Sequence, residues 1–350
     1  MTDFLDSPSP STVPRCSVVV RCYNEERHIG KLLSGIMEQS VQDVQIVIVD
    51  SGSTDRTVEI AQHYPVDLVS IRKEDFSFGY SLNAGCKAAR GKIVVLASAH
   101  VYPTYRDWLE RLIAPFEDPQ VALTYGKQRG DEDTHFSEQR IFRAWFPDHS
   151  DLRQTDPFCN NANAAIRRSL WEKMPYDEIL TGLEDLSWAK QALAQGHRIA
   201  YVAEAEIIHV HDETSAQIFR RYEREAIALK AIYSDSGFSL GSFLRLATQN
   251  IWSDWLAAAK GGKLLGNLFD IARFRTLQFW GTYRGYRQYG RVDDQLRMRF
   301  YYPPETTAKR LEQELRRPGA TPIDYVLTGS EMTGKAASQD SQKTRALLPE

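Results

Sequence analysis

The chain has 350 residues, 42% of them hydrophobic and 25% charged, which is enough for a sizeable core in one large domain or two smaller ones. The net charge of −3 gives no global case for nucleic acid as a partner, and the four scattered cysteines, which form no Cys-x-x-Cys pair, are expected to be reduced thiols of a cytoplasmic protein. No apolar run approaches the roughly 20 residues of a membrane span, and residues 1–14, rich in Ser, Pro and Thr, are expected to be a flexible leader rather than a signal peptide.

Four short apolar runs in residues 15–116 are typical of buried β-strands, and each is followed by a helical pattern. The expected strands cover residues 16–23, 44–50, 67–72 and 92–98, and the expected helices cover residues 26–38, 55–64, 80–90 and 105–116. Strands that alternate with helices predict an α/β fold with a mostly parallel, Rossmann-like sheet. Such sheets bind ligands at the carboxyl ends of their strands, so the polar residues directly after each run are the candidates for a site.

The rest of the chain is less regular up to about residue 235 and helical after it. Strands are expected at 121–128, 158–166 and 198–211, and helices at 184–197 and 215–233. Apolar residues at helical spacing continue over 238–300, whereas residues 306–350 are polar. We therefore predict a main domain at 15–235, a helical extension at 236–305 and a disordered tail at 306–350.

Polar residues follow three of the expected strands. The sequence YNEE begins at Tyr23 after the first strand, DSGSTD begins at Asp50 after the second, and LASAH closes the fourth at His100. A carboxylate at Asp50 can accept hydrogen bonds from a base or a ribose, although the same residues also fit a plain strand-to-helix turn in which Gly52 provides the tight bend. Three such strand ends in one sheet favour a single ligand site at their common edge.

Taken together, the stretches SVVVRCYNEERHIGKLL, IVIVDSGSTDRTVEIA, SLNAGCKAARGKIVVLASAH and GLEDLSWAKQALAQGH resemble the inverting family 2 glycosyltransferases of the GT-A fold. The resemblance covers about residues 15–215 and implies a GT-A nucleotide-diphospho-sugar transferase fold. It also implies transfer of a sugar, with inversion, from a nucleotide-sugar donor to a hydroxyl of a glycan or lipid-linked acceptor. The residues that it assigns to the nucleotide-sugar pocket are Tyr23, Glu25, Asp50, Asn83 and Ser98.

The chain departs from this family at the expected metal site, where Ser98-Ala99-His100 stands in place of the usual Asp-x-Asp. Histidine is a good ligand for Mn²⁺ and a poor one for Mg²⁺. Related enzymes use a histidine here with a second one from downstream, and His209 and His211 are the candidates, since strand alternation puts both on one face. Three interpretations stay open: the histidines bind a divalent ion (Mn²⁺ or Mg²⁺), they or nearby Arg and Lys residues contact the phosphates without a metal, or the site has lost its chemistry.

Glu184 and Asp185 stand at the start of an expected helix, where negative charge is favourable for the helix dipole alone. The resemblance implies that Asp185 is the base that takes the acceptor proton, with Glu184 as its neighbour or an acceptor contact. Trp188 is expected either to stack on the acceptor sugar or to pack in the core. Three asparagines fit either the acceptor side or a polar turn: Asn160, Asn161 and Asn163. A non-catalytic nucleotide-sugar or glycan-binding module on the same fold is the alternative function.

The segment Lys260–Arg291 carries seven Lys or Arg residues and one acid, Asp270, interleaved with Phe, Trp and Tyr. One interpretation is a helix that lies on an anionic membrane surface, which would place the protein peripherally on the inner face of the membrane. The other is a helical extension that packs on the catalytic domain with its basic residues in water. The sequence alone does not decide between them.

Overall fold

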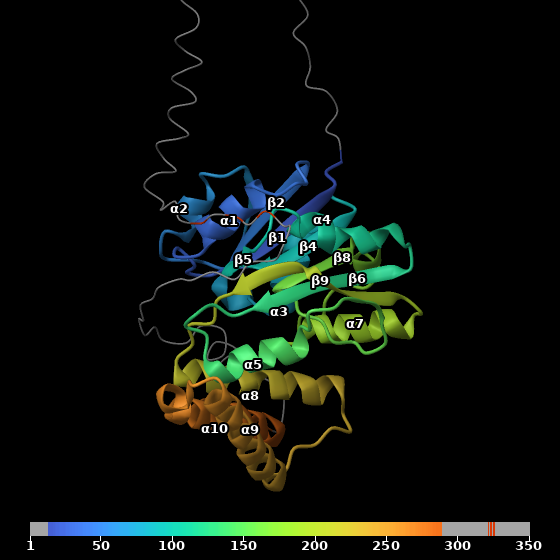
Figure 1. The fold of residues 1–350 in the computed structure, drawn as a ribbon. Helices are drawn as coiled ribbons and strands as arrows, with labels where there is room; N and C mark the ends of the chain where they lie inside the picture. The colour runs from blue at the N-terminus through green and yellow to red at the C-terminus, as the bar shows by residue number, and fades with distance from the viewer. Residues whose placement is uncertain (1–12, 289–320, 322, 324, 326–350) are drawn as a thin grey trace, which may run out of the picture.

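The computed structural model describes residues 13–288 together with residues 321, 323 and 325 (Figure 1). The strands are β1 (Cys16–Cys22), β2 (Val44–Asp50), β3 (Val66–Ser70), β4 (Ile93–Ser98), β5 (Val101–Pro103), β6 (Val121–Arg129), β7 (Asp151–Gln154), β8 (Asn163–Arg167) and β9 (Arg198–His209). The α-helices are α1 (Ile29–Met37), α2 (Thr57–Ala61), α3 (Phe78–Ala88), α4 (Trp108–Ile113), α5 (Phe136–Trp145), α6 (Arg168–Trp171), α7 (Glu184–Ala194), α8 (Ser215–Ile232), α9 (Leu240–Lys260) and α10 (Leu264–Arg287), and two 3₁₀ turns cover Lys73–Asp75 and Ala114–Glu117.

The described residues form a nine-stranded sheet in the order β3-β2-β1-β4-β8-β6-β9-β5, with β7 paired to β9. Strands β3, β2, β1 and β4 are parallel, as the alternation of strands and helices predicts. Around β8 the sheet becomes mixed, because β8 runs antiparallel to both β4 and β6, and β5 and β7 run antiparallel to β9. The α/β prediction is confirmed, but parallel strands make up only part of the sheet.

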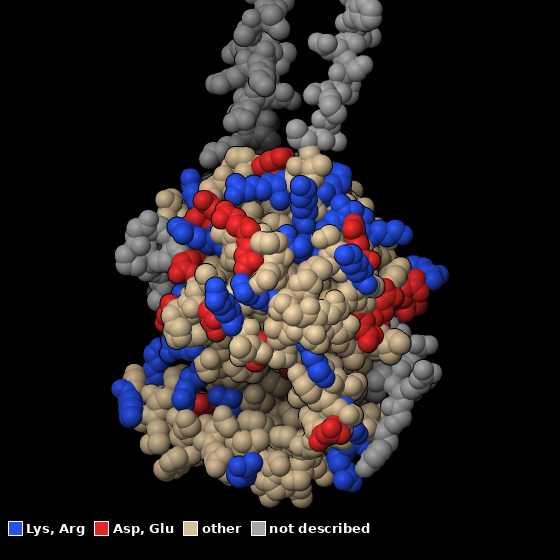
Figure 2. Space-filling view, turned by 90° about the vertical axis from the view of Figure 1, so that its right-hand side faces the viewer, with Lys and Arg blue, Asp and Glu red and all other residues tan. Residues whose placement is uncertain are grey.

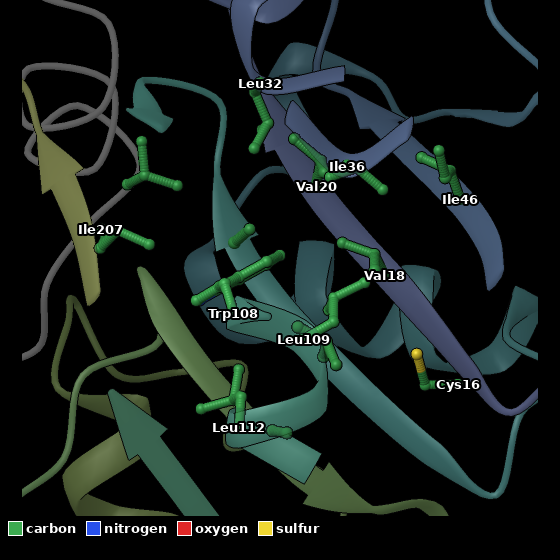
Figure 3. Close-up of a cluster of buried hydrophobic side chains, with 14 of the residues drawn as sticks. Cys16, Val18, Val20, Leu32, Ile36, Ile46, Trp108, Leu109, Leu112 and Ile207 are labelled. Carbon is green, nitrogen blue, oxygen red and sulfur yellow. The ribbon is translucent and has the colours of Figure 1, made fainter. Parts of the chain in front are cut away.

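Helices cover both faces of this sheet, with α1, α2 and α4 on one side and α3 and α7 on the other (Figure 1). Side chains of β1 alternate between the two layers: Val18 and Val20 pack with Leu32 of α1 and Trp108 of α4 (Figure 3), whereas Val19 joins the cluster formed with α3 and α7. Continuous apolar strands are therefore explained by burial on both faces.

Helix α5 was not predicted, and the reason lies in its buried face. This face includes Ser137 and Glu138 beside Ile141 and Phe142, so the helix has no continuous apolar stripe. A polar residue is buried at such a position only when tertiary contacts satisfy its hydrogen bonds. The sequence pattern contains no sign of those contacts.

The C-terminal helical extension is present as α9 and α10, and α10 lies along α8. The close approach of α10 to α8 depends on two glycines of α10. A Cβ at Gly281 would lie 2.5 Å from the Phe219 carbonyl oxygen, and one at Gly285 would lie 2.4 Å from the Glu223 carbonyl oxygen. Helix α8, which the sequence grouped with the main domain, thus packs on the extension. Residues 289–305 of the predicted extension lie outside the described residues.

Most of the predicted leader and tail also lies outside the described residues. In the tail, three described residues contact the end of β5 and the segment after it: the Arg106 N–H donates to the Thr321 carbonyl at 3.1 Å, Tyr325 donates to the Pro103 carbonyl at 2.8 Å, and the N–H of the buried Ile323 donates to the Thr104 carbonyl at 3.3 Å. This part of the tail is therefore packed rather than disordered. Among the described helices, none combines the length and the apolar composition needed to cross a membrane.

Candidate active site

A cavity of about 920 Å³ lies where the ends of β1, β4 and β9 meet α5, α8 and the start of α7. The predicted site residues that line it are Tyr23, Glu25, Ser98, His100, Asn160, Asn161, Glu184, Asp185, His209 and His211. Arg21 of β1 is in register with Ser98 of β4, which is why the YNEE turn and the LASAH end lie at one edge of the sheet. Most of the predicted site residues therefore line this one cavity.

The turn after β1 is fixed by bonds to the loop between β2 and α2. Asn24 adopts φ 54°, and its side-chain oxygen accepts the Thr54 N–H at 2.8 Å. The Glu25 N–H donates to Thr57 Oγ1 at 2.6 Å. These bonds hold the turn at the rim of the cavity, where Glu25 points its carboxylate to His100.

Three histidines from two segments of the chain converge in the cavity. His100 follows β4, His209 ends β9, and His211 comes two residues later; the pairing of Val101 with His209 brings the three together. One ring nitrogen of each lies within 4.8 Å of the other two. The His209 and His211 Nε2 atoms are 3.0 Å apart.

The opposite nitrogen of each imidazole contacts an oxygen acceptor. His209 Nδ1 lies 2.8 Å from Gln128 Oε1, His211 Nδ1 lies 2.7 Å from Glu138 Oε1, and His100 Nδ1 lies 2.8 Å from Glu25 Oε1. An acceptor at Nδ1 assigns the ring proton to that atom, so the second nitrogen of each ring keeps its lone pair. Histidines that bind metals have this arrangement, with an outer oxygen that fixes the tautomer.

The two Nε2 atoms at 3.0 Å are the clearest indication of a cation site. Two neutral imidazole lone pairs repel each other unless a proton or a cation lies between them. Burial, together with His211 and His100, lowers the pKa of His209 well below its ordinary value, which keeps His209 in the neutral form that binds metals. Burial would lower the pKa of His100, but the Glu25 carboxylate, together with the charge of Glu213, raises it above its ordinary value. The three residues fit a divalent ion that accepts nitrogen ligands.

Two of the outer partners, Gln128 and Glu138, were not predicted from the sequence. Burial would raise the pKa of Glu138, but His211 and Arg221 lower it to about 2, so its carboxylate is ionised. Arg221 of α8 donates to Glu138 at 2.6 Å and pairs with Glu213 at 2.5 Å. Glu138 and His211 are 73 positions apart in the chain, and no spacing rule connects them.

Glu184 and Asp185 open α7 directly after Leu183, which adopts a left-handed φ of 55°. Such a conformation in a residue other than glycine carries strain that is common at functional sites. Asp185 Oδ2 accepts the Asn161 N–H at 3.0 Å, and Glu184 lies 3.8 Å from an Arg21 Nη atom. Burial, and then the charge of Glu184, raise the pKa of Asp185 to about 7. Its carboxyl group can therefore exchange a proton near neutral pH.

Two predicted nucleotide-binding residues do not line the cavity. The Asp50 carboxylate is buried and accepts the N–H groups of Gly52 at 3.0 Å and Ser53 at 3.2 Å, so it stabilises the turn after β2. Asn83 accepts the indole N–H of Trp171 at 2.9 Å and bonds both backbone groups of Tyr176. Both side chains are engaged within the fold, so the structure does not support their predicted roles.

Asn163 and Trp188 are also structural. Asn163 is fully buried, accepts the indole N–H of Trp108 at 2.9 Å and donates to the Ala205 carbonyl at 2.8 Å. Asn163 was expected either beside the acceptor or in a polar turn, but its buried hydrogen bonds place its side chain within the core instead. Trp188 is 1% exposed and packs in the core, which was one of its two expected roles.

Comparisons with known proteins identify relatives of this chain. Residues 17–174 match the family described as "Glycosyl transferase family 2". The chain is 26% identical over 223 residues to the O-antigen chain rhamnosyltransferase RfbN of Salmonella typhimurium. This alignment covers 59% of this chain and 70% of that protein. It is 28% identical over 225 residues to the O-antigen chain rhamnosyltransferase WbaN of Salmonella anatum, with 60% and 70% covered. These matches support a family 2 glycosyltransferase.

The fold of this glycosyltransferase is of the GT-A type. The mannosyltransferase PcManGT from Pyrobaculum calidifontis, solved in complex with GDP-Man and Mn²⁺, superposes with a TM-score of 0.54 and 22% identity over 85% of this chain and 90% of that one. The glycosyltransferase activity expected from the sequence is supported by the family match and by the two named relatives. The family match ends at residue 174, before Asp185 and the two downstream histidines, so the roles of these residues depend on the geometry of the cavity.

Proposed function

We propose that the enzyme transfers a hexosyl or deoxyhexosyl group, with rhamnosyl as the leading candidate, from a nucleoside diphosphate to a hydroxyl of a surface-polysaccharide acceptor, with inversion at the anomeric carbon. The two relatives named as O-antigen chain rhamnosyltransferases support this sugar and this kind of acceptor. The observation that carries the mechanism is the presence of the buried Asp185 carboxyl group and the three-histidine cluster in the same cavity.

Asp185 is the proposed base. In a single displacement, the acceptor oxygen forms a bond to the anomeric carbon while the bond from that carbon to the diphosphate oxygen breaks, and the acceptor proton passes to a carboxylate. The Asn161 N–H orients the Asp185 carboxylate, and a pKa of about 7 lets it accept a proton at neutral pH. Buried polar atoms beside it, Asn161 Oδ1 and Arg21 Nη1, have no hydrogen-bond partner among the described residues, which suits the binding of a polar sugar.

The histidine cluster is the proposed divalent metal site, formed by His100, His209 and His211. A bound ion would supply positive charge to the leaving diphosphate. Three imidazoles favour Mn²⁺ over Mg²⁺. The chain's own contribution is to hold the rings in the ligand tautomer through Gln128 and Glu138.

Tyr23 and Ser98 are the proposed nucleotide-sugar contacts that remain at the wall of the cavity. Lys73 donates to the Tyr23 hydroxyl at 2.7 Å and also lies over its ring, so the side chain of Tyr23 is held at this wall. Glu25 has a different role in the proposal, because its carboxylate faces His100 rather than the nucleotide.

The test is release of nucleoside diphosphate from a panel of UDP-, GDP- and dTDP-sugars, with and without Mn²⁺, in the presence of candidate acceptors. Turnover with a dTDP- or GDP-deoxyhexose that requires Mn²⁺ would support the proposal. Tight binding of a donor with no release under any condition would favour the non-catalytic binding module instead. Turnover that is unchanged by a metal chelator would remove the metal from the proposal and leave the histidines as direct phosphate contacts.

A further inference from the structure

The helical hairpin formed by α9 and α10 exposes large apolar side chains around its tip. Trp252 and Leu256 of α9 are 62% and 49% exposed, and Leu265 and Phe269 of α10 are 93% and 84% exposed. We call these four residues, together with Lys260 and Lys263 in the connection between the helices, the hairpin tip. Side chains of this size are usually buried in a water-soluble domain, so a group of four on neighbouring turns indicates a surface that contacts something apolar.

The hairpin itself is well packed without these side chains. Ala258 of α9 and Ile271 of α10 are buried, and Phe274 of α10 packs with residues of α5 and α8, namely Ile141, Ile218 and Tyr222. The Trp255 indole N–H donates to the Leu268 carbonyl at 3.0 Å and joins the two helices near their connection. The exposed residues therefore contribute little to the folding of the hairpin.

The charge of the hairpin is strongly positive. Its Lys and Arg residues are Arg245, Lys260, Lys263, Arg273, Arg275, Arg284 and Arg287, and its only acids are Asp254 and Asp270. Asp254 is 1% exposed and bonded to Arg275, and Asp270 pairs with His135 and Arg273. These pairs also involve Arg273 and Arg275, so five basic residues of the hairpin lie outside them: Arg245, Lys260, Lys263, Arg284 and Arg287. On the face seen in Figure 2, the lower part of the molecule, where the helices lie, is mostly tan with more blue than red.

The hairpin tip could be covered by a second copy of the chain or by a lipid bilayer, and its positive charge distinguishes between these two partners. A second copy of the chain would bring two positive tips together, and like charges in an interface oppose association. An anionic bilayer offers negative headgroups for Lys260 and Lys263 and an apolar layer just below them for Leu265 and Phe269. We propose that the hairpin tip binds the surface of an anionic lipid bilayer, with the apolar side chains inserted at the boundary between headgroups and acyl chains.

Vesicle flotation with the full chain tests this proposal. Vesicles of pure phosphatidylcholine are compared with vesicles of equal parts phosphatidylcholine and phosphatidylglycerol. The wild type should float with the anionic vesicles only, and its binding should weaken as salt is added. Leu265→Ser combined with Phe269→Ser should abolish flotation, and Lys260→Glu combined with Lys263→Glu should lower the partition coefficient by more than about tenfold.

Matched controls come from exposed residues far from the tip. Ile179→Ser changes an apolar side chain that is 82% exposed, and Lys87→Glu with Lys92→Glu reverses two exposed lysines; both variants should float like the wild type. The proposal is overturned if the wild type stays unbound, or if the Leu265/Phe269 variant still floats. It is also overturned if light scattering shows a wild-type dimer that the Leu265/Phe269 variant dissociates, because the tip would then be a contact between copies.

Discussion

Replacing Asp185 by asparagine removes the proposed base and leaves the shape of the side chain almost unchanged. A positioned general base contributes about 10²–10⁴-fold to the rate, so we expect kcat of Asp185→Asn to fall by that factor. Because burial and Glu184 raise the pKa of Asp185 to about 7, the wild-type rate should rise with pH through about 7 and level off above it. The residual rate of the variant should lack this step.

The same substitution should not unfold the protein. The pKa of Asp185 rises from 3.8 to about 7 on folding, so ionising it at pH 8 opposes folding by about 4 kcal/mol. This cost is absent at acid pH and grows as the pH rises from the unfolded value through the folded one. Asparagine removes the cost, but its amide N–H₂ would face an N–H donor, from Asn161 or Leu186, at a cost of about 1–3 kcal/mol. We expect a melting temperature at pH 8 equal to or above that of the wild type.

The assay is steady-state release of nucleoside diphosphate from pH 5.5 to 9, with donor affinity measured separately by calorimetry. Glu184→Gln is the informative partner variant, because removing the neighbouring charge should move the wild-type pH step to lower pH. If Asp185→Asn keeps more than a tenth of the wild-type rate with the same pH step, Asp185 is not the base. Loss of activity together with loss of folding at pH 8 would contradict the assigned pKa.

Three further predictions concern the histidine cluster and its support. His209→Ala should abolish the rise in melting temperature that Mn²⁺ produces, whereas His63→Ala, in an exposed position, should not; an equal response in both would rule out the cluster as the ion site. Glu138→Gln should weaken Mn²⁺ affinity by about 10–100-fold in calorimetry, since the carboxylate fixes its histidine partner, and an unchanged affinity would assign that carboxylate to the ion pair with α8 alone. Asp254→Ala should lower the free energy of unfolding by about 3–5 kcal/mol in urea, because it leaves a buried guanidinium unpaired. Asp148→Ala removes a carboxylate that is 83% exposed, so it should cost about 1 kcal/mol or less, and similar losses in the two variants would contradict the burial argument.

The sequence alone predicted the buried strands of this enzyme and the polar residues that stand at their ends. Continuous apolar runs defined the parallel strands β1, β2 and β4, because strands covered on both faces need apolar residues at every position. The carboxyl ends of such strands lie at one edge of the sheet, so the strand pattern by itself predicts that Tyr23, Glu25 and His100 share a site. The two-residue period of a strand likewise predicts that His209 and His211 lie on the same face.

Only the tertiary structure decided how these residues are supported. Asp50 looked like a ligand contact, but its carboxylate is taken up by the N–H groups of its own turn. The partners that fix the tautomers of His209 and His211 come from β6 and α5, 81 and 73 positions away, and α5 itself went unnoticed because its buried face is partly polar. The physical reason is that periodicity records which face of an element is buried, whereas a buried hydrogen bond depends on which distant element the folded chain places against that face.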